Sequence, residues 1–221
     1  MIIRRLDSTH LTALQDFLLK HINTSMSMSL NLFNAGIEGS GEFSGKYVGA
    51  FDDSERLAGV LVLYWNGILM SQCSEKSLLL QLVADFKKEP FSFQGIFGTT
   101  EQVALIKQEL PVPVDEIAMD SVEQVFSMSL DSLAIPTAYD GMEMVKVGDV
   151  NQSLIAEWLL AYSKEALGLD HYDVDRIYSS PECFVLKVSG QPVSLCNFNA
   201  RLPEVVQVGP VWTPPQYRGC K

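Results

Sequence analysis

The chain has 221 residues, a hydrophobic content of 47%, a charged content of 19% and a formal net charge of −11. Its length fits one large domain or two small ones, and its composition is that of a folded globular protein, which excludes a disordered chain. The acidic balance argues against a nucleic-acid partner, whose binding surface is normally basic. It favours a cationic partner such as an amine only weakly, because acidity also keeps proteins soluble.

Membrane and metal partners are not expected. The longest apolar runs, such as 58–64, are far too short to span a bilayer. The sequence starts Met-Ile-Ile-Arg-Arg, which predicts an opening strand rather than a targeting peptide. The cysteines have no metal-ligand spacing, so we expect no metal site, reduced thiols and a cytoplasmic location. They are Cys73, Cys183, Cys196 and Cys220.

The chain from residue 1 to 133 predicts a cycle of strands and helices. Short β-branched runs predict the strands, and apolar residues at helical spacing predict the helices. The expected strands are 2–6, 47–51, 57–64, 68–72, 91–97, 115–119 and 122–130, and the expected helices are 11–22, 78–88 and 101–110. The methionine and serine alternation of 25–34 imitates a strand, but a short helix ending at Ala35-Gly36 also fits it. With that helix the order is β-α-α-β-β-β-α-β-α-β-β.

Turn and capping residues punctuate this first cycle. Asp7 or Ser8 is expected to cap the first helix, and Thr99 or Thr100 the last. Asn66-Gly67 predicts a hairpin turn, because both residues tolerate positive φ.

A linker, 134–141, precedes a second cycle with the same order of elements. The expected strands are 142–147, 183–188, 192–199 and 205–211, and the expected helices are 154–167 and 173–178. Asp149 or Asn151 is expected to cap the longer helix, and Gly168 to end it. The two halves therefore form a structural repeat by element order.

The last strand leads into a polar turn, Thr213-Pro214-Pro215-Gln216-Tyr217-Arg218-Gly219. Gly209 and Pro210 interrupt the strand and predict a β-bulge. The two prolines end the strand, because proline cannot donate to a ladder. A strand, a bulge and a basic glycine turn form the layout of an anion-binding cradle, although an ordinary strand followed by a Pro-Pro turn has the same residues.

This turn resembles the acetyl-CoA signature of the GNAT superfamily of N-acetyltransferases, which reads Gln/Arg-x-x-Gly-x-Gly/Ala. Gln216 and Gly219 match its first and fourth positions, and Lys221 departs from its sixth. The resemblance implies that backbone N–H groups of the loop hold the pyrophosphate of coenzyme A and that the bulged strand lies beside the pantetheine arm. The residues implied in cofactor binding are Val211, Trp212, Thr213, Gln216, Tyr217, Arg218 and Gly219.

The first cycle has no such signature. Its corresponding turn, 72–77, contains no glycine, and Glu75 would place a carboxylate where the pyrophosphate should lie. The architecture resembles that of bacterial tandem GNAT proteins with a degenerate N-terminal copy. We therefore expect an α/β protein with mixed (α+β) sheets, made of a complete GNAT-like copy over 1–133 and the N-terminal part of a second copy over 142–221.

The resemblance implies an acetyl-CoA-dependent N-acetyltransferase, in which a primary amine of a small molecule or protein attacks the thioester directly. Glu204 is the carboxylate nearest the motif in sequence and is a candidate base, although a solvated turn residue is the plainer interpretation. Asn199 is a candidate for holding the acceptor, and Asn197 is its alternative. His171 could serve as a base beside an aspartate, but an exposed loop histidine is expected. A GNAT-fold binding or regulatory module without catalysis is the alternative function.

The family's helix and strands that follow the loop are not in the sequence, which predicts a truncated second copy. Its last strand would then be an unpaired, valine-rich edge, so we expect the 221-residue chain to bury this edge or to form a homo-oligomer through it. We also expect this chain to bind acetyl-CoA weakly and to be inactive as an enzyme, because the helix that strengthens the anion cradle is missing.

Overall fold

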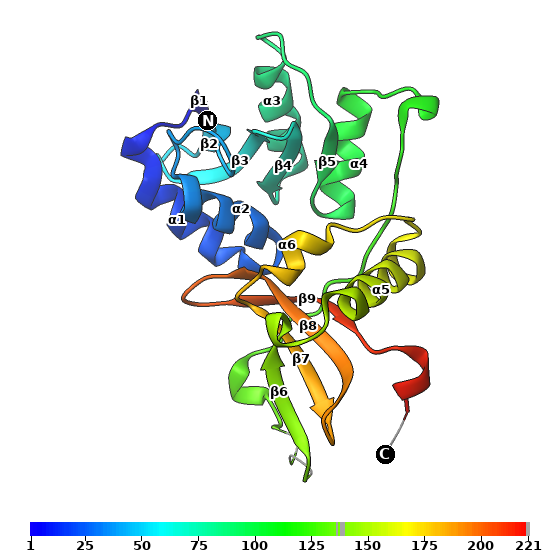
Figure 1. Ribbon diagram of the computed structural model, residues 1–221. Coiled ribbons are helices and arrows are strands. Elements are labelled where there is room, and N and C mark those ends of the chain that lie inside the picture. Colours follow the sequence, from blue (N-terminus) through cyan, green and yellow to red (C-terminus); the bar gives the residue numbers. More distant parts are fainter. Residues whose placement is uncertain (136, 138–139, 220–221) are drawn as a thin grey trace. The chain divides into compact units, whose positions relative to one another are not determined.

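The computed structural model describes residues 1–135, 137 and 140–219 of the chain (Figure 1). The chain is an α/β protein that divides into two compact units, Met1–Met128 and Ser129–Lys221, and each unit has its own sheet. Three residues of the expected linker, 136, 138 and 139, lie outside the described residues. Cys220 and Lys221 lie outside them as well, so the departure of Lys221 from the signature has no structural counterpart here.

A mixed sheet with the strand order β1-β2-β3-β4-β5 forms the centre of the first unit. Neighbouring strands are antiparallel from β1 to β4, and β5 runs parallel to β4. The strands are β1 (Ile2–Arg5), β2 (Gly45–Phe51), β3 (Leu57–Tyr64), β4 (Ile68–Cys73) and β5 (Gly95–Phe97).

Helices cover both faces of this sheet. They are α1 (Leu11–Lys20), α2 (Ile22–Ala35), α3 (Lys76–Phe86) and α4 (Thr100–Glu109). Successive residues of a strand point to opposite faces, so Val60 and Val62 pack against α1 and α2, whereas Leu61 packs against α3 and α4. Because both faces are covered, β3 is a continuous apolar run rather than an alternating one.

The ambiguous methionine and serine segment is part of helix α2. Met28 and Leu32 lie one turn apart and are 2% and 3% exposed, so helical spacing, rather than alternation, matches the buried side chains. Gly36 ends the helix with a φ of 69°, as the expected Ala35-Gly36 stop requires. Asp7 is the N-cap of the short 3₁₀ turn Ser8–His10 before α1, and Thr99 precedes α4 without a side-chain capping bond.

The two closing strands expected over 115–119 and 122–130 are not formed. The stretch instead holds 3₁₀ turns at Val114–Glu116 and Leu130–Ser132, and Val122 and Phe126 are 75% and 86% exposed. Alternation is a local preference, but a strand exists only when it pairs with another backbone, and local sequence does not specify that partner. The expected element order is therefore correct from β1 to α4 and wrong for its last two strands.

Two smaller expectations for the first unit are also corrected. The strand expected over 91–97 is limited to β5, because parallel pairing with β4 begins only at Gly95. In the hairpin turn between β3 and β4, Gly67 has a φ of 77°, but Asn66 has no positive φ. The N–H of Gly67 donates to the carbonyl of Tyr64 (2.9 Å), so the glycine follows a tight turn instead of sharing its centre with Asn66.

The second unit has an antiparallel sheet with the order β6-β7-β8-β9 (Figure 1). Its strands are β6 (Met142–Lys146), β7 (Cys183–Val188), β8 (Gln191–Arg201) and β9 (Val206–Trp212), and its helices are α5 (Gln152–Tyr162) and α6 (Val174–Tyr178). All of these were expected within a few residues. Ser189 and Gly190, both with positive φ, form the turn between β7 and β8.

Helix α5 begins and ends as the sequence predicts. The side chain of Asn151 accepts hydrogen bonds from the N–H groups of Ser153 and Leu154, so Asn151 rather than Asp149 is the cap. After Tyr162 the helix widens into a π-helical turn, Ser163–Leu167, and Gly168 stops it in the left-handed conformation at φ 67°.

One face of the second sheet carries the core of the unit. Ile155, Trp158 and Leu159 of α5 pack there with Val185 and Leu195 of the sheet. On the opposite face Met144 and Val211 are 59% and 58% exposed, and no helix covers it within residues 140–219. Over the described ranges of the whole chain, no helix is both long and apolar enough to cross a bilayer.

Candidate functional site

The candidate site lies at the end of β9, where a β-bulge interrupts the pairing with β8. Trp212 and Val211 pair with Leu195 and Cys196, but the next pair is Val208 with Phe198. Gly209 and Pro210 therefore lie opposite one residue of β8, and the peptide bond between them is cis. The bulge predicted from the Gly-Pro pair is confirmed.

Asn197, the β8 residue opposite the bulge, is 4% exposed and holds this irregular backbone in place. Its amide nitrogen donates to the carbonyl of Gly209 (3.4 Å) and to Oδ1 of Asn199 (3.2 Å). Its own oxygen accepts from the hydroxyl of Ser180 (3.0 Å). A bulge leaves backbone groups without ladder partners, and Asn197 supplies a partner to one of them.

β9 is the edge strand of its sheet, because the side that faces away from β8 has no strand partner in the described part of the chain. On the paired side, the hydroxyl of Ser194 donates to the carbonyl of Trp212 (2.9 Å) and lies 2.9 Å from the hydroxyl of Thr213. These bonds extend the ladder to the last residues before the prolines.

Trp212 anchors the end of β9 in the core of the second unit. It is 4% exposed, and its ring contacts that of Tyr162 with a centroid separation of 6.3 Å. Its indole Nε1 is buried without a hydrogen-bond partner among the described residues. Val211, the preceding residue, points to the opposite face of the sheet.

The polar turn after β9 is a 3₁₀ turn, Pro215–Tyr217, followed by Gly219 at φ 68°. The N–H groups of Tyr217 and Arg218 donate to the carbonyls of Pro214 (2.9 Å) and Pro215 (3.2 Å). A Cβ at Gly219 would meet no atom within 4 Å, so the glycine is required by its backbone conformation and not by crowding.

Arg218 is the cation of this turn, and its guanidinium folds back onto the protein. Nη1 and Nη2 contact the carboxylate of Glu165 at 2.9 and 3.1 Å. Nε donates to the carbonyl of Thr213 (2.7 Å), and the guanidinium carbon lies 4.7 Å from the centre of the Trp212 ring. Glu165 belongs to the π-helical turn, far from Arg218 in sequence, so sequence spacing alone gave no signal for this pair.

The structure brings one predicted catalytic candidate to the bulge and places the other far from it. Asn199 is exposed, and its side-chain nitrogen lies 3.1 Å from where a Cβ of Gly209 would be. Glu204 is an exposed residue of the turn between β8 and β9. Because a strand rises about 3.3 Å per residue, Glu204 and Thr213 lie at opposite ends of β9, about 20 Å apart.

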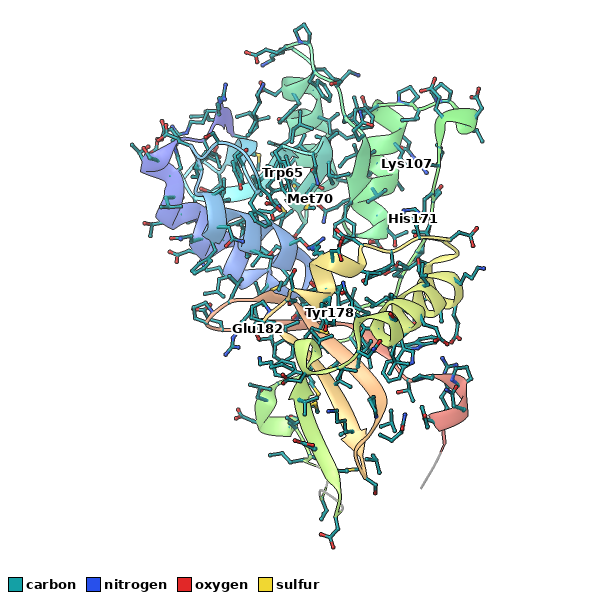
Figure 2. The ribbon with its side chains drawn as sticks, in the orientation of Figure 1. Trp65, Met70, Lys107, His171, Tyr178 and Glu182 are labelled. Carbon is teal, nitrogen blue, oxygen red and sulfur yellow. The ribbon has the colours of Figure 1, made fainter. Side chains whose placement is uncertain are left out.

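Other polar residues near α6 have structural partners. Tyr178 donates from its hydroxyl to the carbonyl of Val150 (2.9 Å), which ties α6 to the loop before α5 (Figure 2). Glu182 pairs with Arg201, with atom separations of 3.1 and 3.2 Å. His171 is exposed, as expected, and its carbonyl accepts a hydrogen bond from the hydroxyl of Ser163 (2.6 Å).

The residues of the site fit coenzyme A in part. The outer edge of β9 offers backbone groups that an extended amide chain can pair with, and Arg218 and Gly219 have the charge and conformation of a phosphate-binding turn. In the described conformation, however, the N–H groups of Tyr217 and Arg218 and the guanidinium of Arg218 already have partners within the protein. The strand fits the pantetheine arm, whereas the turn must rearrange to hold a pyrophosphate.

The corresponding place in the first unit is filled by a side chain. β4 and β5 pair only through Met70, so Ser71 and Cys73 lie beyond the paired region. There the side-chain oxygen of Gln102 accepts hydrogen bonds from the Ser71 hydroxyl (2.8 Å) and the Cys73 N–H (3.0 Å), and Gln102 is 8% exposed. A hollow of about 480 Å³ remains beside it. Gln102 was not predicted from the sequence, because its role depends on the separation of two strands.

Another hollow of the first unit, about 720 Å³, lies beside the loop 36–44 and the ends of β1, β2 and β3. It carries charges of both signs, with Arg5 and Lys46 against Asp7 and Glu38, which favours no single class of ligand. Neither this hollow nor the turn after β9 contains a metal-binding cluster, since no group of three or more His, Cys, Asp or Glu could hold an ion among the residues that the structure describes.

Comparisons with known proteins assign no family to the chain. No protein-family model matches it, and no curated protein matches it.

Proposed function

We propose that the protein is an acetyl-CoA-dependent N-acetyltransferase of the GNAT type, which transfers an acetyl group to a primary amine. The observation that carries the proposal is that a bulged edge strand, β9, runs directly into the turn Thr213–Gly219, whose sequence resembles the acetyl-CoA signature. The β-α-α-β-β-β order of both units and the parallel pairing of β5 with β4 in the first unit are additional support.

A bulged edge strand suits acyl transfer for a physical reason. Its outer N–H and C=O groups are held in place before any ligand binds, so they can pair with an amide-containing arm without a large cost in conformational entropy. An N–H group of the bulged strand that points at the thioester would stabilise the negative charge that develops on its oxygen when the amine attacks. The backbone of Val211, Trp212 and Thr213 takes this role in the proposal.

The proton of the amine must leave during the reaction. In the proposal Asn199, at the bulge, orients the acceptor, because its amide can accept from an amine but cannot act as a base. Glu204 lies at the far end of β9, so a role for it as base requires transfer through water. Acetyl-CoA is made and used in the cytoplasm, and the free thiols of Cys73, Cys183 and Cys196 agree with that location.

Release of free thiol from acetyl-CoA tests the proposed reaction. The full-length gene product is mixed with acetyl-CoA and a panel of primary amines, and the thiol is measured with a chromogenic disulfide. The proposal predicts amine-dependent thiol release for at least one class of amine and loss of this release in Gly219→Val, whose side chain disfavours the φ of 68°. Thiol release that is the same with and without every amine would contradict it.

A binding or regulatory module without catalysis is the second candidate function. The specific observation in its favour is that the guanidinium of Arg218 and two N–H groups of the turn already have partners within the protein. The filling of the equivalent place in the first unit by Gln102 agrees with it. Binding of acetyl-CoA without turnover across the whole amine panel would favour this module over the enzyme.

A further inference from the structure

Arg218 occupies a site in the second unit that is built for a cation. The carboxylate of Glu165 contacts both terminal nitrogens at 2.9 and 3.1 Å, and the carbonyl of Thr213 accepts from Nε at 2.7 Å. The ring of Trp212 lies under the guanidinium, 4.7 Å from its carbon. A carboxylate, a carbonyl oxygen and an aromatic face together are the groups that bind ammonium and guanidinium ions.

The shape of this site is set by the fold and not by Arg218. The ring of Trp212 is 4% exposed and is held in the core beside Tyr162. The π-helical turn that carries Glu165 is fixed by Ser163, which is buried and donates to the carbonyl of His171 at 2.6 Å. The site would therefore keep its three groups in place if the guanidinium left.

Arg218 also lies in the turn that the proposed function assigns to the pyrophosphate of coenzyme A. Arginine binds carboxylate and phosphate with the same fork of N–H groups, so Glu165 and a phosphate compete for one guanidinium. The side chains of Arg218 and Glu165 are 41% and 53% exposed, which leaves both able to exchange partners through solvent.

We propose that Arg218 is an exchangeable occupant of this cation site, and that coenzyme A releases the site for a cationic group of the acceptor by drawing Arg218 to its phosphates. This inference rests on the proposed function and deepens it. It makes Glu165, Thr213 and Trp212 the residues that select the acceptor, and it makes binding of cofactor and acceptor mutually favourable.

The exchange defines the class of acceptor. The nitrogen that attacks must be neutral, whereas the site holds a positive charge, so the acceptor carries two amino groups. One ammonium group binds at Glu165, and the second, neutral amine forms the N–C bond to the acetyl carbon while the C–S bond breaks. Coenzyme A leaves as the thiol, with the proton that the amine has lost. Diamines and polyamines have this chemistry.

The expected energetic effect is modest, because the ion pair is partly exposed. Exposed pairs change an equilibrium by up to about fivefold, and the forked geometry with an aromatic face places this pair near the top of that range. Removing Glu165 frees Arg218 for phosphate, so Glu165→Gln should tighten coenzyme A binding by about two- to fivefold.

Calorimetric titration with two matched amines tests the proposal. 1,5-Diaminopentane and pentylamine have the same chain length and differ in the second cation. With the full-length gene product, the diamine should bind more tightly in the presence of coenzyme A than in its absence, and pentylamine should show no such difference. Glu165→Gln should remove the preference for the diamine, and Arg218→Gln should let the diamine bind without coenzyme A.

Asp170→Asn is the control variant, since it removes an exposed carboxylate that pairs with Lys164 near the same turn and does not contact Arg218. It should leave both amines and coenzyme A unaffected. Equal binding of the two amines under all conditions, or equal coenzyme A affinity in the wild type and Glu165→Gln, would overturn the proposal. Failure of every variant to bind coenzyme A would instead refute the proposed function, and the diamine titration of Arg218→Gln would still decide whether the cation site exists.

Discussion

At the scale of single residues, buried polar side chains determine the geometry of β9. The sequence suggested Asn199 for the site and Asn197 as its alternative, and the structure gives them different surroundings. Asn197 is buried and bonds to Ser180, Asn199 and the Gly209 carbonyl, whereas Asn199 is exposed. Asn197 therefore has a structural role, and Asn199 is available to a ligand.

Replacing Asn197 should destabilise the second unit. Asn197→Ala leaves the Ser180 hydroxyl and the Gly209 carbonyl without their partner, and a buried polar group that loses its partner costs about 1–3 kcal/mol. Urea unfolding should show a free energy of unfolding lower by this amount. Asn199→Ala is the matched control and should stay within about 0.5 kcal/mol of the wild type. Equal losses in the two variants would contradict the role given to Asn197.

Cys183 should make the stability of the second unit depend on alkaline pH. Burial, with a smaller contribution from Cys196, raises the pKa of Cys183 from 9.0 to about 11. Between these values the unfolded chain loses the thiol proton and the folded chain keeps it, so the free energy of unfolding falls as pH rises from 9 to 11 and is unaffected below that window. Urea midpoints measured from pH 8 to 11 should fall less steeply for Cys183→Ala, and parallel curves for the two proteins would show that the thiol does not contribute.

At the scale of elements, the sequence predicted what is decided locally. Helices α1, α3, α4 and α5 follow the spacing of apolar residues, and their ends follow from Asn151 and the glycines. The strands of 115–130 were predicted wrongly, because pairing depends on a distant partner. The site divides in the same way. The bulge and the turn after it are local and were predicted, whereas Glu165 and Gln102 reach their partners only through the fold.

Gly168 should be required by its backbone conformation. It ends the π-helical turn at φ 67°, where a Cβ would meet no atom within 4 Å but would strain the backbone. Gly168→Ala should therefore lower the free energy of unfolding by about 1–2 kcal/mol in a urea titration. Gly148 also has open space around it but no positive φ, so Gly148→Ala should change stability by less than about 0.5 kcal/mol. A neutral Gly168→Ala would show that the turn does not need the left-handed residue.

At the scale of the whole molecule, the chain consists of two units with the same order of leading elements and different fates at the end of their fourth strands. The first unit closes the end of β4 with Gln102, and the second continues β9 into a basic turn. The homo-oligomer expected through the edge of β9 stays a prediction, and light scattering over a range of concentrations would test it. Exposed Val206 and Val208 on that strand are the residues it would bury.

The segment between α4 and the second unit should be the first place that a protease cuts. Glu116 and Glu123 lie in it outside any helix or strand and are exposed, whereas Glu101 is exposed on helix α4. A glutamate-specific protease needs an extended, accessible backbone, so it should cut after Glu116 and Glu123 before it cuts after Glu101. Mass spectrometry of a brief digest identifies the sites. Cutting at Glu101 first, or resistance at all three, would mean that the segment is paired in solution.

Titration of coenzyme A into the full-length gene product, measured by calorimetry beside the variant Gly219→Val, tests the central claim most directly. The account predicts saturable binding to the wild type and its loss in the variant, because valine disfavours the φ of 68° that shapes the turn after β9. Circular dichroism of both proteins should be the same, since Gly219 is exposed and lies outside the core. No heat of binding with the wild type, or equal binding by the two proteins, would contradict the account.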